Sequence, residues 1–352
     1  MLGAVSALLL VGAVPAGAAV TPNPWLEHRF LNIAHQGGED EAPSDTMYAL
    51  TSAVREVNAD MLEIDVHLTR DGHLVVLHDD TVNRTTEVTA DRASGESQVR
   101  DLTVEQIQEL DAAYTFPFYN KSQPADQYPF RGVRTGDERP PPGYSHDDFR
   151  IPTLKQVLDK FRSTPINIEI KQPKTPTGTG GGCVTQNGVE YCDDPQAAVP
   201  IAEALAELVN ERRYASRCDI IVASFAQEPL EAFHALAPDV YLSPSQNALI
   251  AWGFANQPFS PDVVAFQVPP TFQGLDVPEF LLNDKQAHQQ GYAVQVWGTN
   301  ETPAQWETLV DQGVDGIMTA VPRKLEEFLH QQGVARPRGR VRCPSPRARP
   351  VR

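Results

Sequence analysis

The chain has 352 residues, of which 41% are hydrophobic, so it can bury a substantial core and is not disordered as a whole. Its formal net charge is −17, from 46 acidic and 29 basic side chains. This balance argues against a nucleic-acid-binding protein, which needs a broad cationic surface. An anionic substrate would have to be bound by cations placed locally.

The two ends of the chain differ in composition from its centre. Residues 1–18 combine a short apolar run with small residues at 16–18, which is typical of a secretory signal peptide, although no basic residue precedes the run. A membrane anchor is the alternative, but glycine and proline interrupt a run that barely reaches spanning length. Residues 335–352 contain seven arginines and no acid and are predicted to be a disordered tail. We expect a secreted or extracytoplasmic protein with one folded domain over residues 19–334 and no stable membrane insertion.

The four cysteines suit an exported protein in which disulfides form. Cys183 and Cys192 flank a short loop that a disulfide would close. Two interpretations stay open for Cys218, which is either a buried thiol or half of a second disulfide with Cys343. No spacing of cysteine and histidine indicates zinc.

Short β-branched runs alternate with longer amphipathic stretches through most of the chain. This alternation predicts a parallel α/β sheet, and a core of roughly 250 residues favours closure into a (β/α)8 TIM barrel over a doubly wound sheet. Nine strands are predicted rather than eight, so one is expected outside the barrel. The predicted strands cover residues 31–35, 61–68, 74–78, 166–171, 220–225, 240–243, 263–268, 293–297 and 316–319. The predicted helices cover residues 46–57, 103–110, 154–161, 197–209, 279–290 and 302–312.

Two segments interrupt this rhythm. Residues 112–150 are rich in proline, glycine, tyrosine and charge, and residues 172–195 include a flexible glycine-rich run. Loops that follow barrel strands gather at the catalytic end, so we expect both insertions to lie at that face and to roof the site. The alternative is that both insertions are solvent-exposed loops without a function at the site.

Carboxylates recur on one face of two predicted strands. Glu63 and Asp65 are two residues apart, and Glu169 and Lys171 repeat this spacing, so each pair points to one side of its strand. Such a pattern often marks a solvated face, but both faces of a barrel strand are enclosed. Three enclosed carboxylates resist ionisation unless a cation neutralises them, and oxygen ligands suit Ca²⁺ or Mg²⁺. We therefore expect a divalent cation at this end of the sheet.

Two histidines are predicted to lie near these carboxylates. His35 ends the first predicted strand. Asp71-Gly72 indicates a two-residue hairpin turn, whose register would set His78 opposite Asp65. The alternative for His78 is a histidine that only forms part of a turn, and the alternative for Lys171 is an ordinary surface lysine.

The chain resembles the glycerophosphodiester phosphodiesterase family in strings that occur in the family's order and spacing across about residues 32–322. These strings are NIAHQGGEDEAPSDTMYA, EIDVHLTRDGHLVVLHDDTVNRTT, RIPTLKQVL, NIEIK, VASF, VQVWGTN and GVDGIMT. The resemblance implies a TIM barrel of the phospholipase-C-like phosphodiesterase type. It further implies a divalent metal on Glu63, Asp65 and Glu169, acid–base catalysis by His35 and His78, and a substrate pocket lined by Lys171 and Trp297.

The chain departs from the family pattern at two places. It has His35-Gln36-Gly37 where the family usually has His-Arg-Gly, and Ser44-Asp45-Thr46 where the family usually has Glu-Asn-Thr. If Gln36 faces the phosphate, it cannot reproduce the bidentate charged contact of an arginine. Arg84 and Arg150 are candidate replacements whose positions the sequence does not reveal.

The resemblance implies hydrolysis of a glycerophosphodiester to glycerol 3-phosphate and an alcohol. By analogy with related phospholipases, His35 is the expected base and His78 the expected acid. The attacking group is either water or the glycerol 2-hydroxyl.

Three other functions stay open. One is the same chemistry on lipid head groups, as in a lysophospholipase D or a sphingomyelinase D, with an apolar lip formed by Phe116, Phe118, Tyr119 and Phe130. Another is a phosphodiester-binding protein that lost activity through Gln36. The last is a glycosidase using Glu63 and Glu169, which leaves both histidines and Lys171 unexplained.

Overall fold

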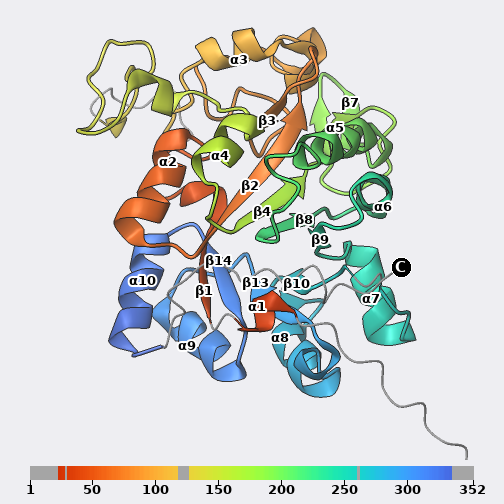
Figure 1. The fold of residues 1–352 in the computed structure, drawn as a ribbon. Helices are drawn as coiled ribbons and strands as arrows, with labels where there is room; N and C mark the ends of the chain where they lie inside the picture. The colour runs from red at the N-terminus through yellow and green to blue at the C-terminus, as the bar shows by residue number, and fades with distance from the viewer. Residues whose placement is uncertain (1–22, 28–29, 118–126, 260–261, 335–352) are drawn as a thin grey trace, which may run out of the picture.

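The computed structural model describes residues 23–27, 30–117, 127–259 and 262–334, so the predicted signal peptide and arginine-rich tail lie outside the described residues. Eight parallel strands form a nearly closed barrel with helices around it, as predicted (Figure 1). Their order is β10-β13-β14-β1-β2-β4-β8-β9, and an isolated parallel bridge between Leu242 and Val263 joins the last strand toward the first. The barrel strands are β1 (Leu31–Ala34), β2 (Met61–Leu68), β4 (Ile166–Ile170), β8 (Ile220–Ala223), β9 (Tyr241–Leu242), β10 (Ala265–Val268), β13 (Ala293–Val296) and β14 (Gly316–Thr319).

The ninth predicted strand, β3 (Leu74–Val76), lies outside the barrel and pairs antiparallel with β2. The predicted register of this hairpin is wrong by one residue. Val66 pairs with Val76, and the amide of Leu77, not of His78, donates to the carbonyl of Asp65. The reason is a three-residue loop at residues 70–72, closed by a hydrogen bond from the amide of Thr69 to the carbonyl of His73.

Ten α-helices are present among the described residues. Predictions at 46–57, 103–110, 154–161, 197–209 and 302–312 correspond to observed helices, whereas the helix predicted at 279–290 is broken into short pieces. Four further helices, Pro24–Glu27, Gln227–Leu236, Gln246–Ala255 and Pro322–Gln331, were not predicted. The helices are α1 (Pro24–Glu27), α2 (Met47–Ser52), α3 (Val104–Glu109), α4 (Leu154–Lys160), α5 (Val199–Val209), α6 (Gln227–Leu236), α7 (Gln246–Ala255), α8 (Val277–Glu279), α9 (Pro303–Gln312) and α10 (Pro322–Gln331). Two π-helical turns, Ala53–Val57 and Phe280–Asp284, extend α2 and α8.

Threonine side chains begin three of the predicted helices. Thr46, Thr103 and Thr153 each accept a hydrogen bond from a backbone amide in the first turn of α2, α3 and α4. These bonds satisfy amide donors that have no partner within a helix. The local sequence therefore sets where each helix begins.

Both insertions are anchored to the rest of the fold. In the first, Phe130, Tyr144 and Phe149 pack around Tyr48 of α2. The second forms a small sheet of β5 (Lys174–Thr175), β6 (Val184–Gln186) and β7 (Val189–Asp193). A disulfide between Cys183 and Cys192 closes this sheet, which confirms the predicted bond. Cys218 is buried at the base of the barrel, and Cys343 lies outside the described residues.

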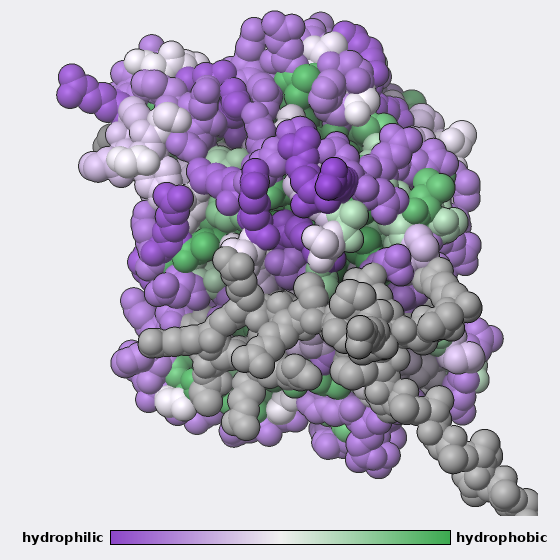
Figure 2. Space-filling view, in the orientation of Figure 1, coloured by the Kyte–Doolittle hydropathy of each residue, from purple (hydrophilic) through white to green (hydrophobic). Residues whose placement is uncertain are grey.

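The core has an inner and an outer part. Trp25 of α1 is fully buried and packs with inward-facing residues of the strands, so α1 closes one end of the barrel. Outward-facing residues such as Ile64 and Val66 pack against the surrounding helices. The face of the molecule drawn in Figure 2 is largely hydrophilic outside the grey atoms. In the described part of the chain, no helix is both long and apolar enough to cross a membrane.

Candidate active site

Pairing of β2 with β4 brings the three predicted carboxylates together. Asp65 lies opposite Glu169 in the parallel register, and Glu63 precedes Asp65 on the same face. Ligand oxygens of these three residues all lie within 4.8 Å of one another. Glu63 and Asp65 are each only 1% exposed. The barrel therefore gathers the expected ligand set at one end.

This cluster has the properties of a site for a divalent cation. In the protein alone, burial and the charge of Asp65 raise the pKa of Glu63 well above its usual value. Neither carboxylate oxygen of Asp65 accepts a hydrogen bond, although both are buried. Buried acceptors without donors are costly, and a hard cation that prefers oxygen ligands would satisfy them. The residues present thus fit Ca²⁺ or Mg²⁺.

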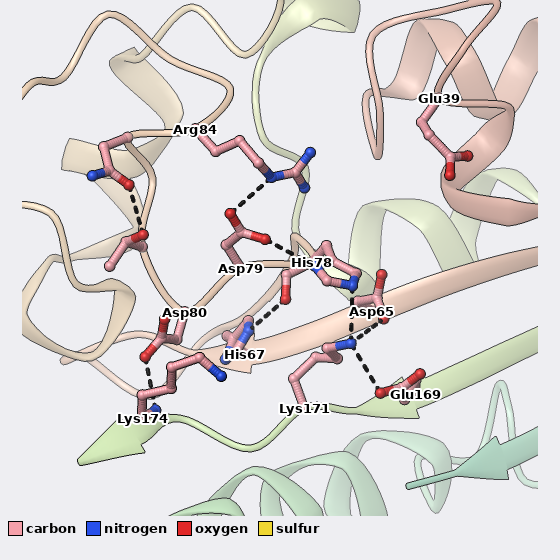
Figure 3. Close-up of polar contacts among 12 residues, drawn as sticks. Glu39, Asp65, His67, His78, Asp79, Asp80, Arg84, Glu169, Lys171 and Lys174 are labelled. Carbon is pink, nitrogen blue, oxygen red and sulfur yellow. Dashed lines mark hydrogen bonds and ion pairs between the residues drawn. The ribbon is translucent and has the colours of Figure 1, made fainter. Parts of the chain in front are cut away.

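Lys171 extends from the end of β4 into the centre of the cluster. Its Nζ lies 3.0 Å from Oε1 of Glu169 and 3.4 Å from Oδ1 of Asp65 (Figure 3). Burial disfavours the charged amine, but these carboxylates outweigh burial and raise the pKa of Lys171 above its usual value. Lys171 therefore stays positively charged at the site. Because the chain as a whole is strongly acidic, an anionic substrate needs such a local cation in order to bind.

His78 follows β3 and is held from two sides. Its Nδ1 lies 2.8 Å from Oδ1 of Asp79, and its Nε2 lies 3.2 Å from Nζ of Lys171 (Figure 3). An ammonium can only donate, so Nε2 is the acceptor and Nδ1 carries the proton donated to Asp79. The backbone of His78 is held as well, because Nε2 of His67 donates to the carbonyl oxygen of His78 at 3.2 Å.

Asp79 and Glu39 orient the two histidines, and sequence reasoning assigned a role to neither. Arg84 donates from Nε to Asp79 at 2.7 Å, so this arginine braces the carboxylate behind His78. Asp79 directly follows its histidine in the sequence, which is the one local signal that could have indicated the pairing. Glu39 lies four residues after His35. This spacing brings two side chains together only where the backbone is helical, and the helical turn at His35 was not predicted from the sequence.

His35 lies in the 3-10 turn that follows β1. Its Nδ1 is 2.5 Å from Oε1 of Glu39, and its Nε2 is 3.8 Å from Oε2 of Glu63. Burial lowers the pKa of His35, but the carboxylates of Glu63 and Glu39 outweigh burial and raise it to about 10. In the protein alone this imidazole is therefore protonated near neutral pH.

The two departures from the family pattern lie side by side beneath His35. Gln36 is 3% exposed, its amide donates to Glu63, and its side-chain oxygen has no hydrogen-bond partner. Asp45 is 2% exposed, neither of its oxygens accepts a hydrogen bond, and its amide donates to the carbonyl of Gln36. Burial and the charge of Asp65 raise the pKa of Asp45 well above its usual value.

A cavity of about 620 Å³ opens above these groups. Of the predicted site residues, His35, Glu63, His78, Glu169, Lys171 and Trp297 line it, whereas Gln36 and Asp65 do not. Its other walls come from loops after β8, β9, β10, β13 and β14 and from α7 and α8. Trp297 follows β13 and contacts Phe225 edge to face, with ring centroids 5.6 Å apart.

Neither insertion contributes a described residue to the cavity, so the expected roof is not observed. The proposed aromatic lip is wrong for Phe116 and Phe130, which pack against each other with centroids 5.8 Å apart. Phe118 and Tyr119 lie outside the described residues. Arg150 does not replace the missing arginine either, because it pairs with Asp147 at 3.4 Å and does not line the cavity.

The fold and the site together define a TIM-barrel enzyme whose centre combines a carboxylate cluster, a partly buried lysine and two oriented histidines. The model of the glycerophosphoryl diester phosphodiesterase family matches residues 35–324, and the chain belongs to this family. The resemblance noted in the sequence is thereby confirmed.

Individual relatives agree with this assignment. The chain is 29% identical over 309 residues to a glycerophosphodiester phosphodiesterase of Caldanaerobacter subterraneus, covering 87% of this chain and 100% of that protein. It is 26% identical to human lysophospholipase D GDPD1, covering 86% of this chain and 88% of that protein. An Oleispira antarctica phosphodiesterase solved with its product sn-glycerol-3-phosphate shares the fold, with a TM-score of 0.58 and 19% identity over 87% of this chain and 99% of that one. Glycerophosphodiester phosphodiesterase from Agrobacterium tumefaciens gives a TM-score of 0.57 at 20% identity, covering 84% of this chain and 98% of that one.

Proposed function

We propose that this enzyme hydrolyses glycerophosphodiesters to glycerol 3-phosphate and an alcohol, using a divalent cation and two histidines. One observation carries the proposal: His35, His78, Lys171 and two of the three clustered carboxylates face a single cavity. A phosphodiester placed there meets both a cationic surface and two groups that exchange protons. A glycosidase would use only the carboxylates, so the lysine and both histidines favour phosphodiester chemistry over that alternative.

Glu63, Asp65 and Glu169 would hold the cation. When bound, a divalent cation supplies charge stabilisation for the non-bridging oxygens of the phosphodiester. Lys171 supports this from the protein side, because its ammonium lies within 3.4 Å of both Asp65 and Glu169 and faces the cavity. Asp65 does not line the cavity itself, but its carboxylate helps to orient the ammonium of Lys171 through their ion pair.

The two histidines divide the proton transfers. One takes the proton of the attacking hydroxyl, and the other protonates the alcohol oxygen as its bond to phosphorus breaks. Assigning the base role to His35 requires a neutral imidazole, and therefore a cation that offsets the charges of Glu63 and Asp65. Assigning the acid role to His78 requires a proton on Nε2, which would move Lys171 toward Glu169 and Asp65. Rapid-quench detection of a cyclic glycerophosphate would identify the glycerol 2-hydroxyl, rather than water, as the attacking group.

The test measures glycerol 3-phosphate released from glycerophosphocholine by metal-stripped protein. We expect no release in excess chelator and recovery on addition of Ca²⁺ or Mg²⁺. Glu63→Gln should abolish the recovery, whereas Glu307→Gln, at an exposed position of α9, should not. Full activity in chelator after dialysis would overturn the cation assignment, and binding of glycerophosphocholine without turnover at any cation concentration would favour a binding protein.

We also propose that the protein is exported and that residues 1–18 are removed as a signal peptide. The support is the apolar run that ends in small residues at 16–18. N-terminal sequencing of protein collected from the medium or the periplasm tests the proposal. A mature chain that retains residues 1–18 would contradict it.

A further inference from the structure

The cavity has two chemically different sides. The catalytic side carries the histidines, carboxylates and lysine described above. The opposite side, here called the apolar wall, carries no titratable group and consists of Leu249, Ile250, Phe254, Phe272, Leu275 and Phe280. These residues come from α7, from the hairpin of β11 (Thr271–Phe272) and β12 (Leu275–Asp276), and from the π-helical turn after α8.

The apolar wall is exposed to a degree that packing does not explain. Phe254 is 67% exposed, Ile250 38% and Phe272 37%. Phe254 stacks on Phe280 with ring centroids 5.2 Å apart, so the rings form one continuous apolar surface. In the described part of the chain, seven large apolar residues are exposed, and four of them line this one cavity: Phe225, Ile250, Phe254 and Phe272. Apolar exposure concentrated in this way marks a binding surface.

A small water-soluble diester does not account for this surface. Glycerophosphocholine is polar throughout, so a bound molecule would leave the apolar wall in contact with water. A cavity of about 620 Å³ also lies in the range that encloses ligands much larger than a glycerophosphodiester. The wall therefore fits a substrate that carries an apolar chain next to its phosphodiester.

We propose that the apolar wall binds the acyl chain of a lysoglycerophospholipid, a lipid with one acyl chain on its glycerol. This inference rests on the proposed phosphodiesterase function and names its substrate class. Water adds across the bond between phosphorus and the head-group oxygen; the hydroxyl stays on phosphorus and the proton goes to the released alcohol. The products are a 1-acyl-glycerol 3-phosphate and the head-group alcohol, choline in the case of lysophosphatidylcholine.

The first experiment is a chain-length series. It compares kcat/KM for glycerophosphocholine with that for lysophosphatidylcholines of six to twelve acyl carbons, each kept below its critical micelle concentration. Burial of each methylene is expected to raise kcat/KM by up to about fourfold until the wall is covered. A kcat/KM that stays constant or falls with chain length overturns the proposal.

The second experiment changes the wall at exposed positions, where folding is little affected. Phe254→Ser and Phe272→Ser should each lower the ratio of kcat/KM for the twelve-carbon lipid to that for glycerophosphocholine by about tenfold or more. Leu236→Ser is the matched control, because Leu236 is 51% exposed at the end of α6 and does not line the cavity. An effect of Phe254→Ser that is confined to phosphatidylcholine vesicles, and absent with monomeric lipid, would make the wall a membrane contact and overturn the proposal.

Binding separates failure of this inference from failure of the proposed function. Calorimetry in excess chelator measures the Kd of 1-acyl-glycerol 3-phosphates of six to twelve carbons. We expect Kd to fall with chain length in the native protein and to fall much less steeply in Phe254→Ser. If this dependence is found without turnover of any diester, the inference stands and the hydrolytic function fails. If glycerophosphocholine is hydrolysed but Kd is independent of chain length, the inference alone fails.

Discussion

Nζ of Lys171 lies 3.2 Å from Nε2 of His78, so the ammonium at the cavity and one of the two histidines share a hydrogen bond. The same ammonium contacts Glu169 and Asp65. Lys171 thereby couples the carboxylate cluster to the group that exchanges protons. Removal of this ammonium should affect charge stabilisation and histidine position together.

We predict that Lys171→Met lowers kcat for glycerophosphocholine by roughly 10²-fold or more, because a preorganised cation is lost where negative charge develops. Lys174→Met is the control. Lys174 follows in the same segment and pairs with Asp193 rather than facing the cavity. The kcat of each variant is measured by steady-state kinetics at saturating Ca²⁺ or Mg²⁺. Equal losses in the two variants would show that the effect is structural rather than specific to the site.

His35→Ala and His78→Ala should each lower kcat by roughly 10²-fold or more, the usual scale of general acid–base catalysis. His73→Ala should leave kcat unchanged, because His73 is 54% exposed in the β2–β3 turn. Circular dichroism of each variant checks the fold. A change in KM alone would demote the affected histidine to a binding role.

Much of this site follows from periodicity in the sequence. The i, i+2 spacing in β2 and β4 places Glu63, Asp65 and Glu169 correctly, because adjacent parallel strands fix both the face and the register. The register of the β2–β3 hairpin was wrong because Asp71-Gly72 fits a two-residue turn locally, while the chain forms a three-residue loop around Gly72 at φ +81. His78 still reaches the site because it follows the strand and is held by Asp79.

The apolar side of the cavity was not predictable in the same way. In α7, Trp252 is buried in the core while Leu249, Ile250 and Phe254 face the cavity, so no single apolar stripe reveals the helix. The helix predicted at 279–290 breaks because Phe280–Asp284 forms a π-helical turn. Burial of Gln36 and Asp45 likewise depends on how β1 and α2 pack, which local sequence does not encode.

Removal of the disulfide by a Cys183→Ser, Cys192→Ser double change should lower Tm by about 2–5 °C, because the bond closes a short loop in a small peripheral sheet. Kinetic constants should stay within about twofold, since no described residue of this sheet lines the cavity. Differential scanning calorimetry provides the measurement. Loss of cooperative unfolding would mean that the insertion stabilises the barrel itself.

Gln36→Arg tests the first departure from the family pattern. Gln36 is buried beside Glu63 without lining the cavity, so a longer arginine must extend toward the cavity to keep its charge hydrated or paired. We expect inhibition by inorganic phosphate to strengthen by about tenfold, as charge-assisted hydrogen bonds are worth about 1.5–3 kcal/mol. A loss of activity would indicate overfilling of the buried space. No change in KM, kcat or phosphate inhibition would place residue 36 outside the reach of the phosphate.

Asp45→Asn tests the second departure, and we expect it to stabilise the protein in chelator. Burial and Asp65 raise the pKa of Asp45 above its unfolded value of roughly 3.9, so the folded state holds this proton more tightly than the unfolded state does. The free energy of unfolding therefore falls as pH rises above about 4, by at most about 1.4 kcal/mol per pH unit, until the raised pKa is passed. An asparagine does not titrate, so the gain in Tm over the native protein should be small near pH 4 and grow toward neutral pH. Asp284→Asn, at an exposed position, is the control and should give no such trend. A Tm difference for Asp45→Asn that stays constant from pH 4 to pH 8 would show that Asp45 is ionised and compensated in the folded protein.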